Sequence, residues 1–227
     1  MTNESTSERI IRTATRLFAE HGMDHVSLRQ INVEAGQKNA SALHYHFGSR
    51  LALIEAIFET HMRPLNVRRE KMMDIVEQEG RSGNLHALIA VKLFPLMDYL
   101  TDRSDGRYYV SFLSQALSNP DVQCRQIVGG KLDRGLERVV AHVLAALPHL
   151  PASVVKARFR MLTAFITHAL TDFLRYQAEF PEKQNSDDLE NYFGMLIDME
   201  VSALSAPVSA YSEIRKMTLS DKALQGV

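Results

Sequence analysis

The chain has 227 residues, 45% of them hydrophobic, which is enough apolar material to bury a substantial core and argues against disorder as the default state. Its 26 Lys and Arg residues balance 27 Asp and Glu residues to a formal charge of -1, which argues against a protein that coats nucleic acid by its overall charge. The single cysteine, Cys124, excludes an intramolecular disulfide and a metal cluster built on cysteines.

The first helix is expected over residues 6–21, because apolar residues recur there at spacings of three and four. These residues are Ile10, Ala14, Leu17 and Phe18. The helix should end at Gly22, since glycine tolerates the left-handed conformation found just past a helix. The arginines of this segment are Arg9, Arg12 and Arg16. We interpret them as its solvated face, with contact to DNA phosphates as the alternative.

Two short helices around a glycine turn are expected next. Ser27 can cap the first of them in a capping box with Gln30, and Gly36 should end it. The second should begin near Asn39, a favoured capping residue, and turn Leu43 and Phe47 inward. Ser41, His44 and Tyr45 then point outward. Such a pair is a helix-turn-helix, whose second helix reads the major groove of DNA.

The composition of this segment suits DNA. Between Glu34 and Glu55 there is no Asp or Glu, so a phosphate backbone can approach without meeting a carboxylate. The candidate DNA-binding residues are Ser27, Arg29, Lys38, Asn39, Ala40, Ser41, His44, Tyr45, His46 and Arg50. A surface helix pair with core aromatics is the alternative, and for His46 a half-buried structural role is about equally favoured. A metal site at His44 and His46 is not expected, because side chains two residues apart on a helix point about 200° apart, whereas paired helical ligands are four residues apart.

Beyond residue 49 the sequence predicts longer helices over residues 49–79, 84–102, 105–118, 120–147, 152–180 and 187–205. We therefore predict an all-α protein of about nine helices, divided into residues 1–48 and 49–227. Pro64 and Pro95 should kink their helices or end them early, because proline lacks a backbone donor. No apolar run reaches the roughly 18 to 20 residues of a membrane span, and the polar start lacks the apolar stretch of a secretory signal. We expect a cytoplasmic protein without a membrane partner.

The first fifty residues resemble those of TetR-family transcriptional regulators. The resemblance lies in Ala14-Thr15-Arg16-Leu17-Phe18 followed by Gly22, in Val26-Ser27-Leu28-Arg29-Gln30-Ile31, and in Tyr45-His46-Phe47-Gly48-Ser49-Arg50. It implies that Ser27 and Arg50 contact phosphates, that Arg29 approaches a base or phosphate, and that Asn39 to Tyr45 read the groove. The chain departs from the family pattern in one extra residue before Phe47 and in His44, where a tyrosine is usual.

The resemblance also implies a larger helical domain, residues 49–227, that binds a small effector and holds two subunits together. Central helices offer residues that could line an apolar pocket, although a place in a closed core is the favoured assignment for any single one of them, including a hydrogen-bonded core position for the histidine. The candidates are Met72, Leu93, Phe94, Met97, Tyr108, Phe112, Met161, Phe165 and His168. The stretch Asn39 to Gly48 is similar to branches of the family that sense fatty acids, acyl-CoA thioesters or other apolar metabolites.

The last two long helices are the candidates for a homodimer interface, which family members form as a four-helix bundle. The candidates are Phe159, Leu162, Ile166, Leu170, Phe173, Tyr192, Phe193, Leu196, Met199 and Leu204. Packing within one chain is the alternative for the same residues. A symmetric dimer would place two recognition helices about one DNA turn or somewhat more apart, so its operator should be roughly palindromic.

These observations favour a ligand-responsive repressor that binds double-stranded DNA and is released by a small apolar effector. A constitutive dimeric DNA-binding protein whose large domain binds no ligand is the alternative. No Gly-x-Ser-x-Gly, phosphate-binding glycine loop or metal-spaced His/Glu cluster occurs, so we expect neither an enzyme nor a cofactor.

Overall fold

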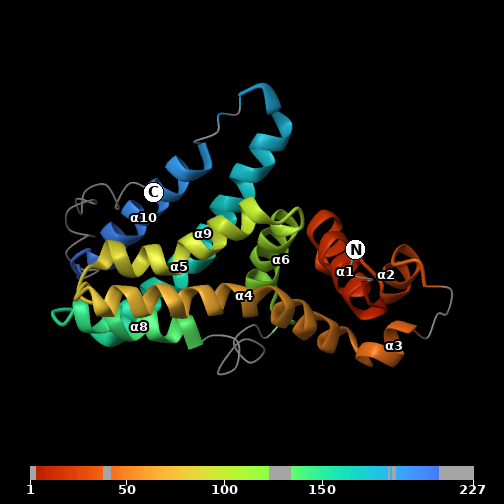
Figure 1. The fold of residues 1–227 in the computed structure, drawn as a ribbon, viewed down its shortest axis with the longest axis horizontal. Coiled ribbons are helices and arrows are strands. Elements are labelled where there is room, and N and C mark those ends of the chain that lie inside the picture. The colour runs from red at the N-terminus through yellow and green to blue at the C-terminus, as the bar shows by residue number, and fades with distance from the viewer. Residues whose placement is uncertain (1–3, 38–41, 123–133, 184, 186–187, 210–227) are drawn as a thin grey trace, which may run out of the picture.

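The computed structural model describes residues 4–37, 42–122, 134–183, 185 and 188–209. Across these residues the chain forms nine α-helices, two short 3-10 turns and no strand (Figure 1). The predicted all-α class is therefore confirmed. None of the helices in these ranges is both long and apolar enough to cross a lipid bilayer.

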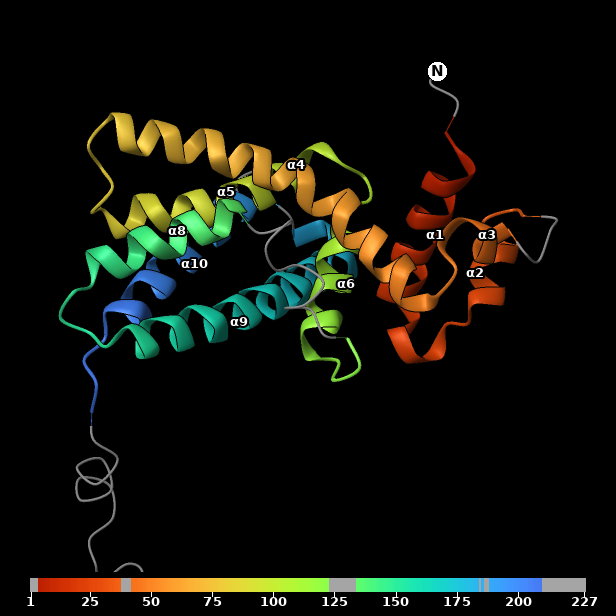
Figure 2. The same ribbon diagram turned by 90° about the horizontal axis from the view of Figure 1, so that it is seen from below.

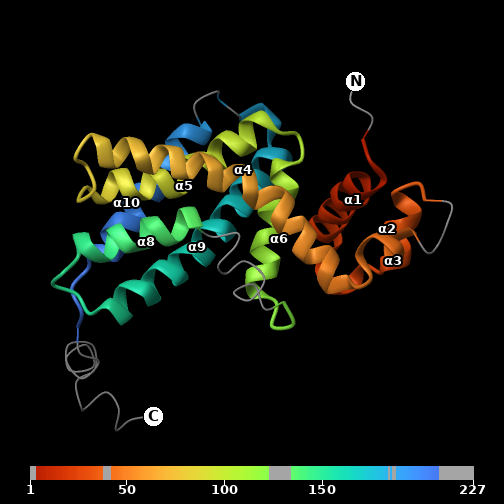
Figure 3. The same ribbon diagram turned by 60° about the horizontal axis from the view of Figure 1, so that its bottom comes forward.

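The helices form a small group and a large group. The small group is α1 (Thr6–His21), the 3-10 turn η1 (Met23–His25), α2 (Leu28–Glu34) and α3 (Ala42–Phe47). The large group is α4 (Arg50–Gln78), α5 (Leu85–Asp102), α6 (Gly106–Ser118), α8 (Arg134–Ala146), α9 (Ala152–Glu179), the 3-10 turn η2 (Pro181–Lys183) and α10 (Asp188–Ser205). Figure 3 shows the small group at one end of the molecule, with α4 running from α3 into the large group and α6 standing beside α1.

Most helix ends match the predicted ones because polar side chains cap them. Ser49 Oγ accepts a hydrogen bond from the Ala52 amide at the start of α4, and Asn84 Oδ1 accepts one from the Ala87 amide at the start of α5. One predicted start is wrong within the described ranges, since residues 120–122 form a turn and not the beginning of a helix. There the Asp121 amide donates to the Asn119 side chain, which draws the backbone out of a helical path.

The two prolines do not end their helices, because Pro64 lies inside α4 and Pro95 inside α5. Buried apolar residues flank Pro64 on both sides, among them Ile57, Phe58, Leu65 and Met73. Burial of several such side chains outweighs the roughly 3 kcal/mol that an interior proline costs. The axis of α4 changes direction along its length in Figure 2, as expected for a helix that contains proline.

A continuous apolar core joins the small group to the large group. Phe18 of α1 stacks against Phe112 of α6 with ring centroids 6.2 Å apart, and Phe58 of α4 lies 5.2 Å from Phe112. All three rings are fully buried. Because interiors are close-packed, α4 and α6 cannot move far without affecting the packing of α1.

A buried ion pair lies deep in the large group. Lys92 of α5 donates to Glu200 of α10, and both side chains are shielded from solvent. The Lys92 ammonium lies 4.4 Å from the centre of the Phe159 ring on α9. Burial lowers the pKa of Lys92 and raises the pKa of Glu200, and the attraction between the two charges opposes both shifts. The pair therefore links α5 to α10 next to α9.

Candidate DNA-binding site

Hydrogen bonds to the backbone define both ends of α2. Ser27 Oγ accepts from the Gln30 amide, 3.1 Å away, and so starts α2. At its other end the Gly36 amide donates to Val33 and the Gln37 amide donates to Asn32, which is the Schellman arrangement. Gly36 has φ of 68°, a conformation that favours glycine. Helix α2 thus ends just before Gly36, as the sequence predicted.

The short helix α3 turns one face inward and another outward. Leu43 is buried and Phe47 is half-buried against the core, whereas His44, Tyr45 and His46 are exposed. Tyr45 is 86% exposed. Such exposure of a large aromatic side chain is typical of a surface that binds a partner. The sequence therefore predicted correctly that Leu43 faces the core and that His44 and Tyr45 face solvent, whereas His46, for which a half-buried role was about equally favoured, is exposed.

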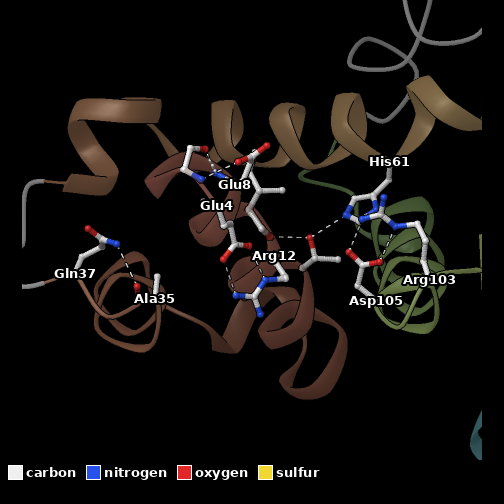
Figure 4. Close-up of polar contacts among 11 residues, drawn as sticks. Glu4, Glu8, Arg12, Ala35, Gln37, His61, Arg103 and Asp105 are labelled. Atoms are coloured by element: carbon white, nitrogen blue, oxygen red, sulfur yellow. Dashed lines mark hydrogen bonds and ion pairs between the residues drawn. The ribbon is translucent and has the colours of Figure 1, made fainter. Parts of the chain in front are cut away.

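Two arginines of α1 pair with carboxylates of the same chain. Arg12 makes two hydrogen bonds to Glu4, 2.8 and 3.0 Å long (Figure 4), and these lower the pKa of Glu4. Arg16 contacts Glu20 at 2.8 Å and Glu34 at 2.7 Å. Glu34, the last carboxylate before the acid-free segment, is therefore paired with a positive charge of the same chain. These contacts favour the surface interpretation of the α1 arginines over phosphate contact.

The remaining candidates fall into three sets. Arg29 is exposed on α2, and the Ser27 hydroxyl, although it accepts one bond, keeps its own hydrogen to donate. Lys38, Asn39, Ala40 and Ser41 lie outside the described residues, so their role stays a prediction. Arg50 is half-buried and its guanidinium points toward the protein: Nη1 donates to the Val26 carbonyl at 2.7 Å, and Nη2 donates to the Met23 carbonyl.

The side chain of Gln115 on α6 ties the large group to the small one. Its Oε1 accepts from the Met23 amide at 3.2 Å, and its Nε2 donates to the Ala19 carbonyl at 3.1 Å. Close by, Asn119 donates to Asp24 at 3.1 Å. No feature of the sequence distinguishes Gln115 from other polar residues of an amphipathic helix, so sequence analysis did not identify this contact.

A buried histidine lies at the same junction. His61 of α4 contacts Tyr99 Oη of α5 through Nδ1 at 2.5 Å and Thr15 Oγ1 of α1 through Nε2 at 3.4 Å. Its ring stacks on Tyr109 of α6, with centroids 4.5 Å apart. Burial lowers its pKa from 6.5 to about 4, against the opposing charge of Asp105, which lies nearby in Figure 4. A neutral imidazole thus joins four helices at neutral pH.

The residues predicted to line a pocket do not form one site. Met72, Phe94 and Met97 line an open groove of about 370 Å³ between α4 and α5, together with Arg68 and Lys71. The others lie elsewhere: Leu93 and Phe112 are core residues, Tyr108 is half-buried on α6, and Met161 and Phe165 are exposed on α9. His168 is held by Ser114 Oγ at 2.7 Å and Ser118 Oγ at 3.1 Å.

Most of the predicted dimer residues pack within the chain itself. Buried in the core are Phe159, Ile166, Leu170, Phe193, Leu196 and Leu204. Leu162 is half-buried, and Phe173 stacks on Tyr192 at 4.2 Å. Of the predicted set only Met199 is exposed. The structure thus favours the core interpretation for the buried residues. The sequence pattern marks an apolar face but does not show whether the same chain or a second subunit covers it.

Comparisons with known proteins agree with this architecture. The family model for bacterial regulatory proteins of the tetR family matches residues 10–57, and that for the tetracyclin repressor-like C-terminal domain matches residues 93–203. No curated protein matches the sequence.

Solved structures of similar fold include the TetR-family transcriptional regulator PfmR from Thermus thermophilus, with 15% identity, a TM-score of 0.52, and coverage of 91% of this chain and 99% of that one. Another is a TetR-family regulator from Mesorhizobium loti, with 19% identity, a TM-score of 0.48, and coverage of 87% and 95%. With family models matching both parts of the chain, this protein belongs to the TetR family of transcriptional regulators, which are DNA-binding proteins and not enzymes.

Proposed function

We propose that this protein is a ligand-responsive repressor that binds a roughly palindromic operator as a homodimer in the cytoplasm. The observation that carries the proposal is the exposed face of α3, which presents His44, Tyr45 and His46 to solvent. Leu43, on the opposite face, is buried in the core. Hydrogen-bonding and aromatic groups on such a face suit base edges and thymine methyl groups in the major groove. In this proposal residues 1–48 form the DNA-binding domain, and Ser27 and Arg29 contact the backbone.

For the dimer we propose the exposed face of α9 and α10. On α10 Met195 is 55% exposed and Met199 is 52% exposed, and Gly194 beside them has no neighbouring side chain within 4 Å of the position a Cβ would take. On α9 Met161 and Phe165 are also exposed. Exposed methionines and a phenylalanine on adjacent helices support an isologous interface between two copies of the chain.

The effector would act through the shared core. A small apolar molecule, such as a fatty acid or acyl-CoA thioester, bound among the helices of residues 49–227 would shift α4 and α6 relative to α1. The groove lined by Met72, Phe94 and Met97 is one place where the effector could bind. Because Gln115 and His61 tie these helices to α1, such a shift would move α3 away from its DNA-bound spacing. An effector changes operator affinity only by its preference between the two arrangements, typically about 1 to 3 kcal/mol.

The test has two steps. First, the protein is used to select sequences from random double-stranded DNA, and a roughly palindromic consensus is expected. Second, fatty acids and CoA thioesters are screened by thermal shift, and compounds that stabilise the protein are added to the DNA complex. Release of DNA by a stabilising compound supports the repressor. Enrichment of a consensus without any stabilising compound would instead support a constitutive DNA-binding protein.

A further inference from the structure

We propose that Arg50 is a positioning residue that closes the helix-turn-helix into a ring, and that it is not the phosphate contact that its place in the sequence suggests. The helix-turn-helix runs from Ser27, the cap of α2, to Ser49, the cap of α4. Arg50 is the first residue of α4, and Val26, whose carbonyl it binds, directly precedes Ser27. One side chain therefore joins the two ends of the motif.

The contacts of the guanidinium suit arginine better than lysine. Nη1 and Nη2 donate to two different carbonyls, those of Val26 and Met23. The guanidinium carbon lies 4.9 Å from the centre of the Phe18 ring, which is fully buried in the core of α1. A planar fork can donate to two acceptors and stack on a ring at once, whereas a lysine ammonium has neither the fork nor the plane.

The carbonyls depend on these bonds as well. Met23 and Val26 are almost fully buried, and a buried carbonyl without a donor costs free energy. The loop of residues 22–27 sets where α2 begins, and α3 packs against α1, α2 and α4. Fixing this loop to the start of α4 holds α3 from both sides. A recognition helix that is already held in place loses less conformational entropy when it binds DNA.

The positioning role and the phosphate role predict different behaviour for two variants. Arg50→Lys keeps the positive charge but loses the fork, and Arg50→Met keeps the stem but loses the charge. We would measure binding to the DNA consensus selected by the protein at several salt concentrations, and amide hydrogen exchange in α2 and α3 without DNA. Arg29→Met serves as a comparison for loss of an exposed cation, and Arg63→Lys as a matched exchange at an exposed site of α4.

If Arg50 positions the motif, both Arg50 variants bind the consensus about tenfold more weakly or worse, exchange α2 and α3 amides faster, and keep the parent dependence of binding on salt. Arg63→Lys behaves like the parent. Parent-like exchange and binding in Arg50→Lys, or an Arg50→Met salt slope lower by roughly 2 per dimer, would overturn the inference. The exchange measurement needs no DNA, so the inference is tested separately from the DNA-binding function on which its binding arm rests.

Discussion

The buried histidine at the domain junction should make the protein sensitive to mild acid. The pKa of His61 is about 4 in the folded chain, whereas a histidine in the unfolded chain titrates near 6.5. Below pH 6.5 the unfolded state therefore binds a proton at His61 that the folded state does not bind, and the free energy of unfolding falls until about pH 4. From these two values, His61 should remove about 2 kcal/mol of stability between pH 7 and pH 5.

This prediction is tested with His61→Gln, which does not titrate and can still bond to Tyr99. Urea unfolding of the parent and the variant is followed by circular dichroism at pH 7 and pH 5. Titration of all other groups affects both proteins alike, so the parent should lose about 2 kcal/mol more than the variant over this interval. Equal losses in the two proteins would refute the claim that His61 is held neutral by burial.

Lys92→Met should lower the free energy of unfolding by about 3 to 5 kcal/mol, because Glu200 is left as an uncompensated buried charge, while adding Glu200→Leu should restore most of it in urea titrations. A double variant no more stable than the single one would contradict this. Gln115→Ala should cost about 1 to 3 kcal/mol and speed amide exchange at the end of α1, since two bonds across the junction are lost; unchanged exchange there would count against its bridging role. Changing Met195 and Met199 together to Asp should yield a monomer of unchanged helicity in sedimentation experiments. A persisting dimer would exclude the proposed face.

Helices and their ends could be predicted from the sequence because local interactions determine them. The caps Ser27, Ser49 and Asn84 bond to backbone amides three residues away, and Gly36 supplies a conformation that few other residues adopt. The outward position of His44 and Tyr45 followed from the spacing of Leu43 and Phe47. These features involve neighbours in the chain, so no knowledge of the tertiary fold is needed.

Contacts between distant segments could not be predicted in this way. Arg50 is long enough to reach either DNA or the protein, and only the position of the Val26 carbonyl, 24 residues away, decides between them. Periodicity marked Phe159 and Phe193 as apolar faces, but whether another helix or a second subunit covers them depends on tertiary packing. The sequence left open whether Pro64 would kink its helix or end it, and burial elsewhere in α4 decides for a helix that continues through the proline.

The most direct test of the central claim is the affinity of α3 variants for DNA selected by the parent protein. His44→Ala and Tyr45→Ala should each weaken binding to the consensus by roughly 1 to 3 kcal/mol, about 5- to 150-fold, with unchanged melting temperature, because both side chains are exposed. His149→Ala, an exposed histidine between α8 and α9, should bind like the parent. Parent-like affinity in both α3 variants would contradict the assignment of α3 as the helix that reads DNA.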